Sequence, residues 1–451
     1  MRKSLVVAAL GSLVLWGNTI HAQNKKCGNE IILEEIAKDP IKQKAFEEYR
    51  AQVNEEVRAY SAARAKSANK TTGNVSIPVV FHFVLSQAQI DQIGGQAGIY
   101  KRVQQQITVL NSDFNATNID INNVPTAFKS LIGNAEMNFG LAHRMPDGTG
   151  TTGIEILVKP ANFTGYSASD NNVKNTNGGG LDAWDHNQYL NVWVTNLTTT
   201  GLLGYAYSPQ FTQQLQIPLR YQGAVIHYGA IGVPDGSPNQ YFVSQVARRS
   251  RTLVHELGHF FNLNHIWGNT AVGSGNCLDD DDVGDTPRQE DANQSVCPTG
   301  VKANCSNNPH VGGEMYMNYM DYTGDACTIM FTKGQVERMR AQIAPGGASY
   351  GLTLNGDVMT WPTSISSIER DNTFSIAPNP SNGVVNINFI EQTNNLQYIN
   401  VLNITGQLVE KIVVTEQKAN YSVDLTNAPK GVYVLQLGFD AGIISKKVIV
   451  Q

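Results

Sequence analysis

The sequence predicts an α/β (α+β) domain built around one central helix, followed by a small all-β sandwich. Strand-like apolar runs alternate with helical stretches before that helix, which is typical of a mixed sheet covered by helices. Beyond residue 374 the pattern consists of short alternating strands and turns. At 451 residues the chain is also longer than one ordinary domain.

Residues 1–22 are expected to be a signal peptide. Two basic residues precede an apolar run from Leu5 to Trp16, and Ile20-His21-Ala22 forms an acceptable cleavage site. The alternative is a membrane anchor, but this run is too short to span a bilayer, and no later stretch is apolar enough to do so. We therefore expect a secreted or cell-surface protein without a transmembrane segment. A net charge of −5, without a basic block, argues against a nucleic-acid partner.

Residues 23–70 differ in composition from the rest of the chain. They are rich in Glu, Lys, Arg and Ala and are predicted to form one or two helices. Basic positions near the end of this stretch, such as Arg64 and Lys70, suit a pro-segment that is removed at a basic site. The alternative is a plain helical spacer.

Residues 75–345 are expected to form the α/β domain. Its predicted elements are strands at 77–84, 137–142, 189–194, 203–209 and 225–228, a helix at 100–114, and a closing helix that Thr332 caps and that ends near Ala344.

The stretch from Arg251 to Gly268 carries the metal ligands. His255 and His259 are four residues apart, so they share one face of a helix. Two imidazoles at this spacing bind one Zn²⁺, and Glu256 can hold a metal-bound water beside them. A catalytic zinc takes three protein ligands, and His265 is the third candidate if the helix ends soon after His259. The alternative is a helix that carries three histidines by chance.

A cysteine-rich and acidic stretch follows this helix. Four of the five cysteines gather there and predict two disulfides in an exported protein, with three possible connectivities: Cys277, Cys297, Cys305 and Cys327. Between Asp279 and Asp285, five carboxylates occur in seven residues and repel one another unless a cation lies among them. Such dense oxygen ligands suit Ca²⁺, although a solvated acidic loop is the alternative.

The remaining residues predict a linker and a second domain. Residues 346–373 contain Gly, Ser and Pro and are expected to be the linker. Residues 374–451 are expected to form the β-sandwich, with strands at 384–389, 399–403, 407–414, 421–425, 431–437 and 443–450.

The pattern HExxHxxxxxH with a later methionine turn resembles the metzincin zinc peptidases. Metzincins have glycine where this chain has Asn262, and asparagine is the other residue that tolerates the left-handed turn needed there. Several segments are similar to the pappalysin family, in its cytophagalysin and ulilysin branch, over roughly residues 75–345: IPVVFHFV, LNSDF, DAWDHNQYLNVWV, LLGYAYSP, HELGHFFNLNHIWG, DVGDTP and MNYMDYTGDACTIMFTKGQVERM.

This resemblance implies roles for further residues. Met320 is expected under the zinc as the methionine of the turn, and Tyr322 is expected to reach the reaction intermediate. Calcium is typical of this region of the family, and Asp281, Asp285 and Thr286 are the favoured ligands. The cysteine pattern of the family implies the pairs Cys277–Cys305 and Cys297–Cys327.

Cys27 resembles the cysteine switch of latent metzincins. It stands between Lys26 and Gly28, and a thiolate can fill the fourth position on zinc and keep the enzyme latent. The alternative is an unpaired or oxidised thiol on a mobile terminus.

The end of the chain resembles the C-terminal sorting domain of type IX secretion substrates, on the segments Pro378-Asn379-Pro380, Thr405-Gly406-Gln407, Lys430-Gly431-Val432-Tyr433 and Lys446-Lys447. That resemblance implies recognition by a secretion machinery. A sandwich that binds carbohydrate or protein is the alternative.

Taken with the resemblance, the sequence predicts a secreted zinc endopeptidase made as a latent precursor. A zinc-bound water, assisted by Glu256, would hydrolyse peptide bonds of protein substrates. The substrate is expected to lie extended against an edge strand, for which Leu203, Gly204 and Tyr205 are candidates. The alternative is a zinc-containing adhesin or binding protein that is catalytically silent.

Overall fold

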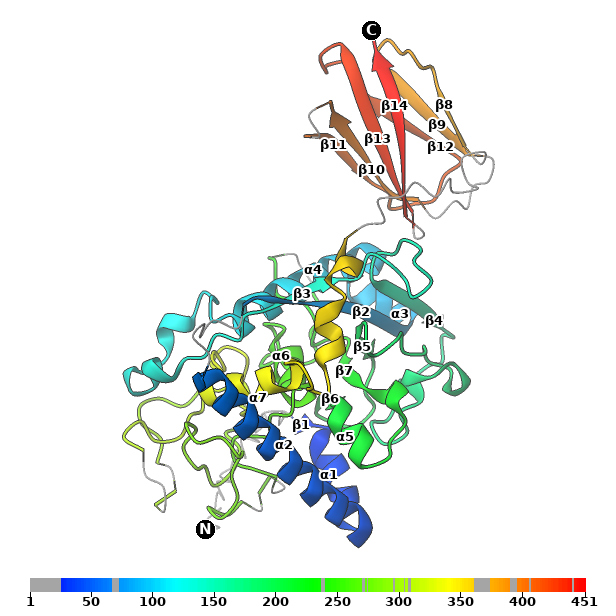
Figure 1. Cartoon of the computed structure of the whole chain (residues 1–451). Coiled ribbons are helices and arrows are strands. Elements are labelled where there is room, and N and C mark those ends of the chain that lie inside the picture. The colour runs from blue at the N-terminus through cyan, green and yellow to red at the C-terminus, as the bar shows by residue number, and fades with distance from the viewer. Residues whose placement is uncertain are drawn as a thin grey trace, which may run out of the picture.

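A computed structural model describes residues 26–66, 73–236, 240–269, 272–273, 275–294, 297–303, 305–306, 310–360, 374–389, 396–404, 407–439 and 442–451. The expected signal peptide lies outside these residues. The larger part of the chain is a mixed α/β domain, and the C-terminal part is an all-β sandwich, which confirms the predicted fold class (Figure 1).

The larger domain is organised around a seven-stranded sheet. Its order is β1 (Lys26–Cys27), β6 (Leu202–Tyr207), β7 (Gly223–His227), β5 (Leu190–Thr195), β2 (Val75–Ser86) and β3 (Met137–Leu141), while β4 (Ile154–Lys159) also pairs with β2. Strand β2 is buried from Ile77 to its end, as expected of a parallel strand covered on both faces. Strand β6 runs antiparallel to β7, whereas β5, β7, β3 and β4 join their neighbours in parallel. The sheet therefore changes direction at β6, close to the helix that carries His255 and His259.

Helices cover this sheet and share its core. They are α3 (Gln87–Gln92), α4 (Gly95–Phe114), α5 (Pro209–Gln214), α6 (Arg251–Phe260) and α7 (Lys333–Ile343). Helix α4 begins five residues before its predicted start because Gly94 adopts a left-handed conformation (φ 94°) that opens the helix. Helix α7 confirms the predicted closing helix, since Thr332 and Gln335 form a reciprocal cap at its start. Leu110 of α4 and Leu257 of α6 lie in one apolar core with the strands.

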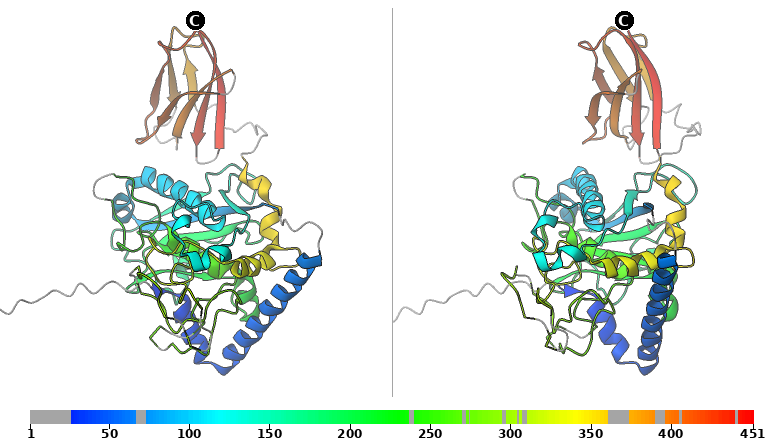
Figure 2. Two further views of the ribbon diagram at one scale, coloured as in Figure 1. Left: turned by 90° about the vertical axis from the view of Figure 1, so that its left-hand side faces the viewer. Right: turned by 60° about the vertical axis from the view of Figure 1, so that its left-hand side comes forward.

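Two helices lie between β1 and β2, as the composition of residues 23–70 predicts. Helix α1 (Asn29–Ala37) is short, and α2 (Pro40–Lys66) is a long helix along the outside of the larger domain (Figure 2). Proline suits the first position of α2, where its missing N–H costs no hydrogen bond. Near its end α2 contacts α7, where Ser61 and Arg64 bind Glu337.

The expected linker at 346–373 is wrong in its first part. Tyr350–Leu354 and Gly356–Met359 form 3₁₀ turns, and Leu352 is buried in the main core with the strands. Burying these apolar side chains compensates for ordering the segment. The larger domain therefore continues to about Thr360, and residues 361–373 lie outside the described part.

The sandwich consists of two antiparallel sheets. One has the order β11 (Leu408–Val413), β10 (Leu396–Asn403), β13 (Gly431–Phe439) and β14 (Gly442–Val450), and the other β12 (Asn420–Asp424), β9 (Val384–Phe389) and β8 (Phe374–Ala377). Alternate residues such as Val385, Ile387, Leu435 and Leu437 are buried between the sheets. The six predicted strands are confirmed to within about three residues, and β8 was not predicted.

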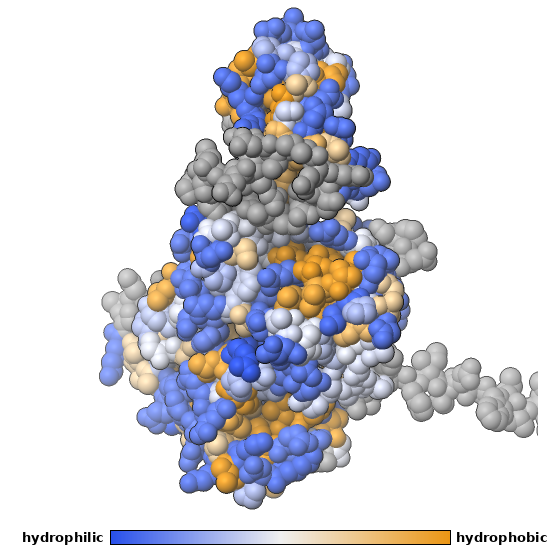
Figure 3. Space-filling view, turned by 90° about the vertical axis from the view of Figure 1, so that its right-hand side faces the viewer, coloured by the Kyte–Doolittle hydropathy of each residue, from blue (hydrophilic) through white to orange (hydrophobic). Residues whose placement is uncertain are grey.

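The surface is mixed in polarity. On the side shown in Figure 3 most of the surface is hydrophilic, with apolar patches separated by polar residues. No helix among the described residues is both long and apolar enough to cross a membrane.

Candidate active site

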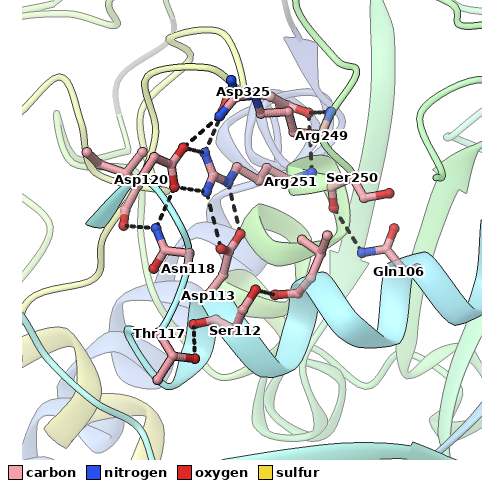
Figure 4. Close-up of polar contacts among 12 residues, drawn as sticks. Gln106, Ser112, Asp113, Thr117, Asn118, Asp120, Arg249, Ser250, Arg251 and Asp325 are labelled. Carbon is pink, nitrogen blue, oxygen red and sulfur yellow. Dashed lines mark hydrogen bonds and ion pairs between the residues drawn. The ribbon is translucent and has the colours of Figure 1, made fainter. Parts of the chain in front are cut away.

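Helix α6 is fixed at its start by a buried arginine. The Arg251 guanidinium forms a two-pronged contact with Asp113 (3.0 and 3.3 Å) and another with Asp120 (2.6 and 2.8 Å), and it donates to the Asp325 carbonyl (2.7 Å) (Figure 4). Its donors are thus shared among α4, the following loop and the segment after Met320.

Asp325 closes the same helix end. Its Oδ2 accepts hydrogen bonds from the backbone N–H groups of Arg249 (3.0 Å) and Arg251 (3.3 Å). A carboxylate suits a helix N-terminus, where N–H groups have no partner within the helix. Asp325 therefore joins the segment after Met320 to the start of α6.

Helix α6 ends at Phe260, directly after His259, as the third ligand requires. Asn262 has a φ of 65°, the left-handed conformation expected at this turn. Its side chain accepts from Tyr49 (2.9 Å) and donates to Gln210 (2.9 Å). The turn brings His265 back beside the helix.

The three histidine side chains converge. Nε2 of His259 lies 3.1 Å from Nε2 of both His255 and His265. Nδ1 of His255 contacts the Tyr319 carbonyl (2.7 Å), and Nδ1 of His259 contacts the Leu263 carbonyl (2.8 Å). A carbonyl only accepts, so these Nδ1 atoms carry the protons and the facing Nε2 atoms present lone pairs.

This donor set fits a bound cation. Burial lowers the pKa of His259 to about 4 and that of His265 well below its ordinary value, so both rings are neutral. Neutral imidazole is the form that binds zinc. The lone pairs of nitrogen atoms that face each other at 3.1 Å repel each other unless a metal ion lies among them.

The carboxylate of Glu256 lies beside strand β6. A Cβ atom on Gly204 would lie 2.8 Å from both Cγ and Oε1 of Glu256, so this position leaves room for glycine alone. Glu256 is buried and accepts a weak hydrogen bond from Cys27 Sγ (3.5 Å).

Met320 and Tyr322 lie next to the histidines. A Cβ on Gly258 would lie 2.4 Å from Met320 Sδ, which shows how closely the methionine packs against α6. The Tyr322 ring is 5.0 Å from the His265 ring and 5.8 Å from the His255 ring. Trp267 stacks on His265 at 4.4 Å and holds the third imidazole in place.

Cys27 joins the histidine cluster from the N-terminal segment. Its Sγ and one nitrogen from each of the three histidines all lie within 4.8 Å of one another. Strand β1, which contains Cys27, pairs with β6, and the N–H of Gly28 donates to the Gly204 carbonyl (2.7 Å). The segment therefore occupies the free edge of the strand where Leu203, Gly204 and Tyr205 are expected to hold substrate. Both Leu203 and Tyr205 direct buried side chains into the domain, so this edge offers backbone groups.

The acidic loop contains two carboxylate oxygens without a hydrogen-bond partner among the described residues. These are Oδ2 of Asp281 and Oδ1 of Asp285, both buried. Thr286 donates from Oγ1 to Oδ1 of Asp281 (2.6 Å), and burial raises the pKa of Asp281 to about 8. Buried unpaired carboxylate oxygens are costly, and a hard cation would satisfy them. Disulfides Cys277–Cys305 and Cys297–Cys327 hold this region, with the pairing that the resemblance implies.

Several residues of the site were not predicted. Glu30 and Tyr49 of the N-terminal segment contact Tyr322 and Asn262, and Arg251 anchors α6. Glu30 and Tyr49 lie in an ordinary charged helical stretch, so the sequence carries no signal that they contact the site, and only the folded structure shows it. Arg251 lies four residues before His255, and this helical spacing could have suggested a role below the metal site.

Comparisons with known proteins agree with this geometry. Residues 169–344 match the peptidase family described as pregnancy-associated plasma protein-A, and residues 375–451 match the secretion system C-terminal sorting domain. An extracellular metalloprotease of Arthroderma benhamiae is 30% identical over 342 residues, covering 75% of this chain and 90% of the relative. One from Arthroderma gypseum is 29% identical, covering 75% and 89%.

Solved structures show the same relationship. A promirolysin mutant of Tannerella forsythia is 34% identical with a TM-score of 0.63, covering 75% of this chain and all of that one. Mature mirolysin of Tannerella forsythia in complex with a cleaved peptide is 38% identical with a TM-score of 0.57, covering 65% of this chain and all of that one. Sequence, fold and site thus agree, and they confirm the predicted family and the predicted export. This chain belongs to the pappalysin family of metalloendopeptidases and is a secreted protein with a type IX secretion sorting domain.

Proposed function

We propose that this metalloendopeptidase uses His255, His259 and His265 to hold one zinc ion and Glu256 as its general base. The observation that carries the proposal is the convergence of three imidazole Nε2 atoms beside a buried carboxylate. When bound, zinc would polarise the scissile carbonyl and lower the pKa of a water molecule. Glu256 would accept the proton of the attacking water and pass it to the leaving amine. Tyr322 would donate its hydroxyl proton to the developing oxyanion.

We propose further that the full chain is a latent precursor whose pro-segment lies within residues 23–70. The position of Cys27 Sγ among the three histidines supports a role as the fourth metal ligand. The pairing of β1 with β6 supports a block of the edge that would bind substrate. Removing this segment would free the metal position and the strand edge together.

Calcium is proposed at the acidic loop, with Asp281, Asp285 and Thr286 as ligands. The two unsatisfied buried carboxylate oxygens support this site. Its role would be structural, because Cys297–Cys327 joins the cysteine-rich stretch that contains this loop to the segment after Tyr322.

The test compares casein cleavage by the protein without its pro-segment, its Glu256→Ala variant and a Glu290→Ala control at an exposed position. We expect about one zinc per chain in all three, with cleavage lost only in Glu256→Ala. Zinc-loaded protein that leaves every peptide intact in all three forms would instead support a catalytically silent binding protein.

A further inference from the structure

The segment that covers the active site holds Tyr322 as well as the histidine cluster. The Tyr322 hydroxyl donates a hydrogen bond to a carboxylate oxygen of Glu30 and accepts one from the backbone N–H of Cys27 (3.1 Å). We propose that Glu30 is a second inhibitory group of the pro-segment, which captures the Tyr322 hydroxyl and acts independently of the Cys27 thiol. The proposal rests on the latency proposed above.

The Tyr322 hydroxyl has a single proton, and it donates this proton in the hydrogen bond to Glu30. While this contact persists, Tyr322 has no proton left for the oxyanion of a bound substrate. A hydrogen bond to a carboxylate is among the stronger ones in proteins. The catalytic hydroxyl is therefore engaged on its donor side and on one acceptor side.

The backbone around Glu30 is fixed on strand β6, which sets the position of the carboxylate. The N–H of Gly28 donates to Gly204 (2.7 Å), and the side chain of Asn29 accepts from the N–H of Ala206 (3.1 Å). Glu30 follows directly in the first turn of α1, where a negative charge is favoured by the helix dipole. Tyr322 is buried against Trp267 (4.8 Å), so both partners are held in place.

The two inhibitory groups act on different parts of the site. Cys27 Sγ lies among the three histidines and contacts Glu256, whereas Glu30 contacts Tyr322. Oxidation or alkylation of the thiol would remove the first contact and leave the second. The full chain should therefore remain partly inhibited when Cys27 has lost its thiol.

The chain offers a readout that is independent of catalysis. Cys27 is the free cysteine, and the other four form disulfides. In the full chain carrying Glu256→Gln, which prevents self-cleavage, the rate of Cys27 alkylation by iodoacetamide reports release of the segment. We expect Glu30→Ala to raise this rate about tenfold and Glu30→Gln, which keeps an acceptor without the charge, to raise it less. Glu35→Ala, on the same helix and well exposed, is the matched control and should change the rate less than twofold.

A double-mutant cycle assigns the effect to the contact itself. In a Tyr322→Phe background, Glu30→Ala should change the alkylation rate less than twofold. An equal tenfold rise with and without the Tyr322 hydroxyl would overturn the proposal, as would no rise with Glu30→Ala alone. Hydrogen exchange of the backbone amides of residues 29–37 identifies a loss of α1, and only variants that keep α1 are compared.

A second arm measures activity. Intact Cys27→Ser chains with Glu256 present should cleave a short fluorogenic peptide about tenfold faster when Glu30→Ala is added, with mass spectrometry showing an uncut chain. Equal rates would contradict the proposal. Absence of cleavage in every variant, including chains without the pro-segment, would count against the proposed catalytic residues, and the alkylation cycle would still decide the role of Glu30. A thiol that reacts at the rate of the unfolded chain in every variant would overturn latency and this proposal together.

Discussion

Replacing Gly28 by alanine should loosen the contact of the proposed pro-segment with β6 without changing a proposed catalytic residue. The added Cβ would lie 2.8 Å from Tyr205 Cβ and 3.4 Å from the Gly204 carbonyl oxygen. Ordinary contacts between carbon atoms begin at about 3.5 Å, so the segment that carries the new alanine must move away from β6. Overpacking of this kind costs about 1–3 kcal/mol, and the lower chain entropy of alanine returns about 0.4–1 kcal/mol. With a mid-range cost of about 2 kcal/mol and a return of about 0.7 kcal/mol, the net effect is about 1.3 kcal/mol, equivalent to about tenfold more open segment.

Limited trypsin digestion measures this opening, because cleavage in residues 26–66 follows the population of the released state. The substitution is made in the full chain with Glu256→Gln, so that no self-cleavage contributes. Gly431→Ala is the control, since a Cβ there meets no atom within 4 Å. A Gly28→Ala chain cut at the parental rate would refute the idea that this close contact with β6 holds the segment.

Further substitutions test the rest of the site. Gly204→Ala should displace Glu256, because the new Cβ would lie 2.8 Å from its Cγ; steady-state kinetics should show kcat/KM lowered about a hundredfold with zinc content unchanged. Arg251→Lys keeps the charge but loses the two-pronged contacts to Asp113 and Asp120, so urea unfolding should show a loss of about 3 kcal/mol, and a loss below about 0.5 kcal/mol would contradict the anchoring role. Removing calcium with a chelator should lower the melting temperature of the parent, and Asp285→Asn should abolish this response while a Glu290→Ala control keeps it. Burial lowers the pKa of His227 to about 4, below about 6.5 in the unfolded chain, so the stability it contributes is complete above about pH 6.5 and declines by about 3 kcal/mol as the pH falls toward 4; a His227→Gln variant should show a shallower decline in urea unfolding at each pH.

Local patterns were enough to predict most of the fold. Buried strands such as β2 and β5 are rich in apolar residues, and the cap at Thr332 is a local signal that the structure reproduces. Strand β4 and helix α5 were missed because they are six residues long and carry little periodicity. The 3₁₀ turns from Tyr350 onward were taken for a linker, since their order depends on burial of Leu352 by distant residues.

The residues of the candidate site fall into two groups, those related by local sequence and those brought together by the fold. His255, Glu256, His259 and His265 lie within eleven residues, so helix geometry alone relates them. The contacts of Glu30 with Tyr322 and of Tyr49 with Asn262 join residues more than 200 positions apart. No local pattern encodes such pairs, and tertiary packing decides them.

The pairing of β1 with β6 also affects how this part of the molecule can associate with other chains. An unpaired strand edge presents a row of N–H and C=O groups that invites association with other chains. While residues 26–28 occupy that edge, the backbone groups of Gly204 and its neighbours are already satisfied. Under the latency proposed above, the precursor would keep this strand edge paired, and loss of residues 26–28 would expose the edge and the proposed catalytic groups together. An extended chain that paired with the exposed edge would lie beside Glu256, so substrate binding and the proposed cleavage would become possible together.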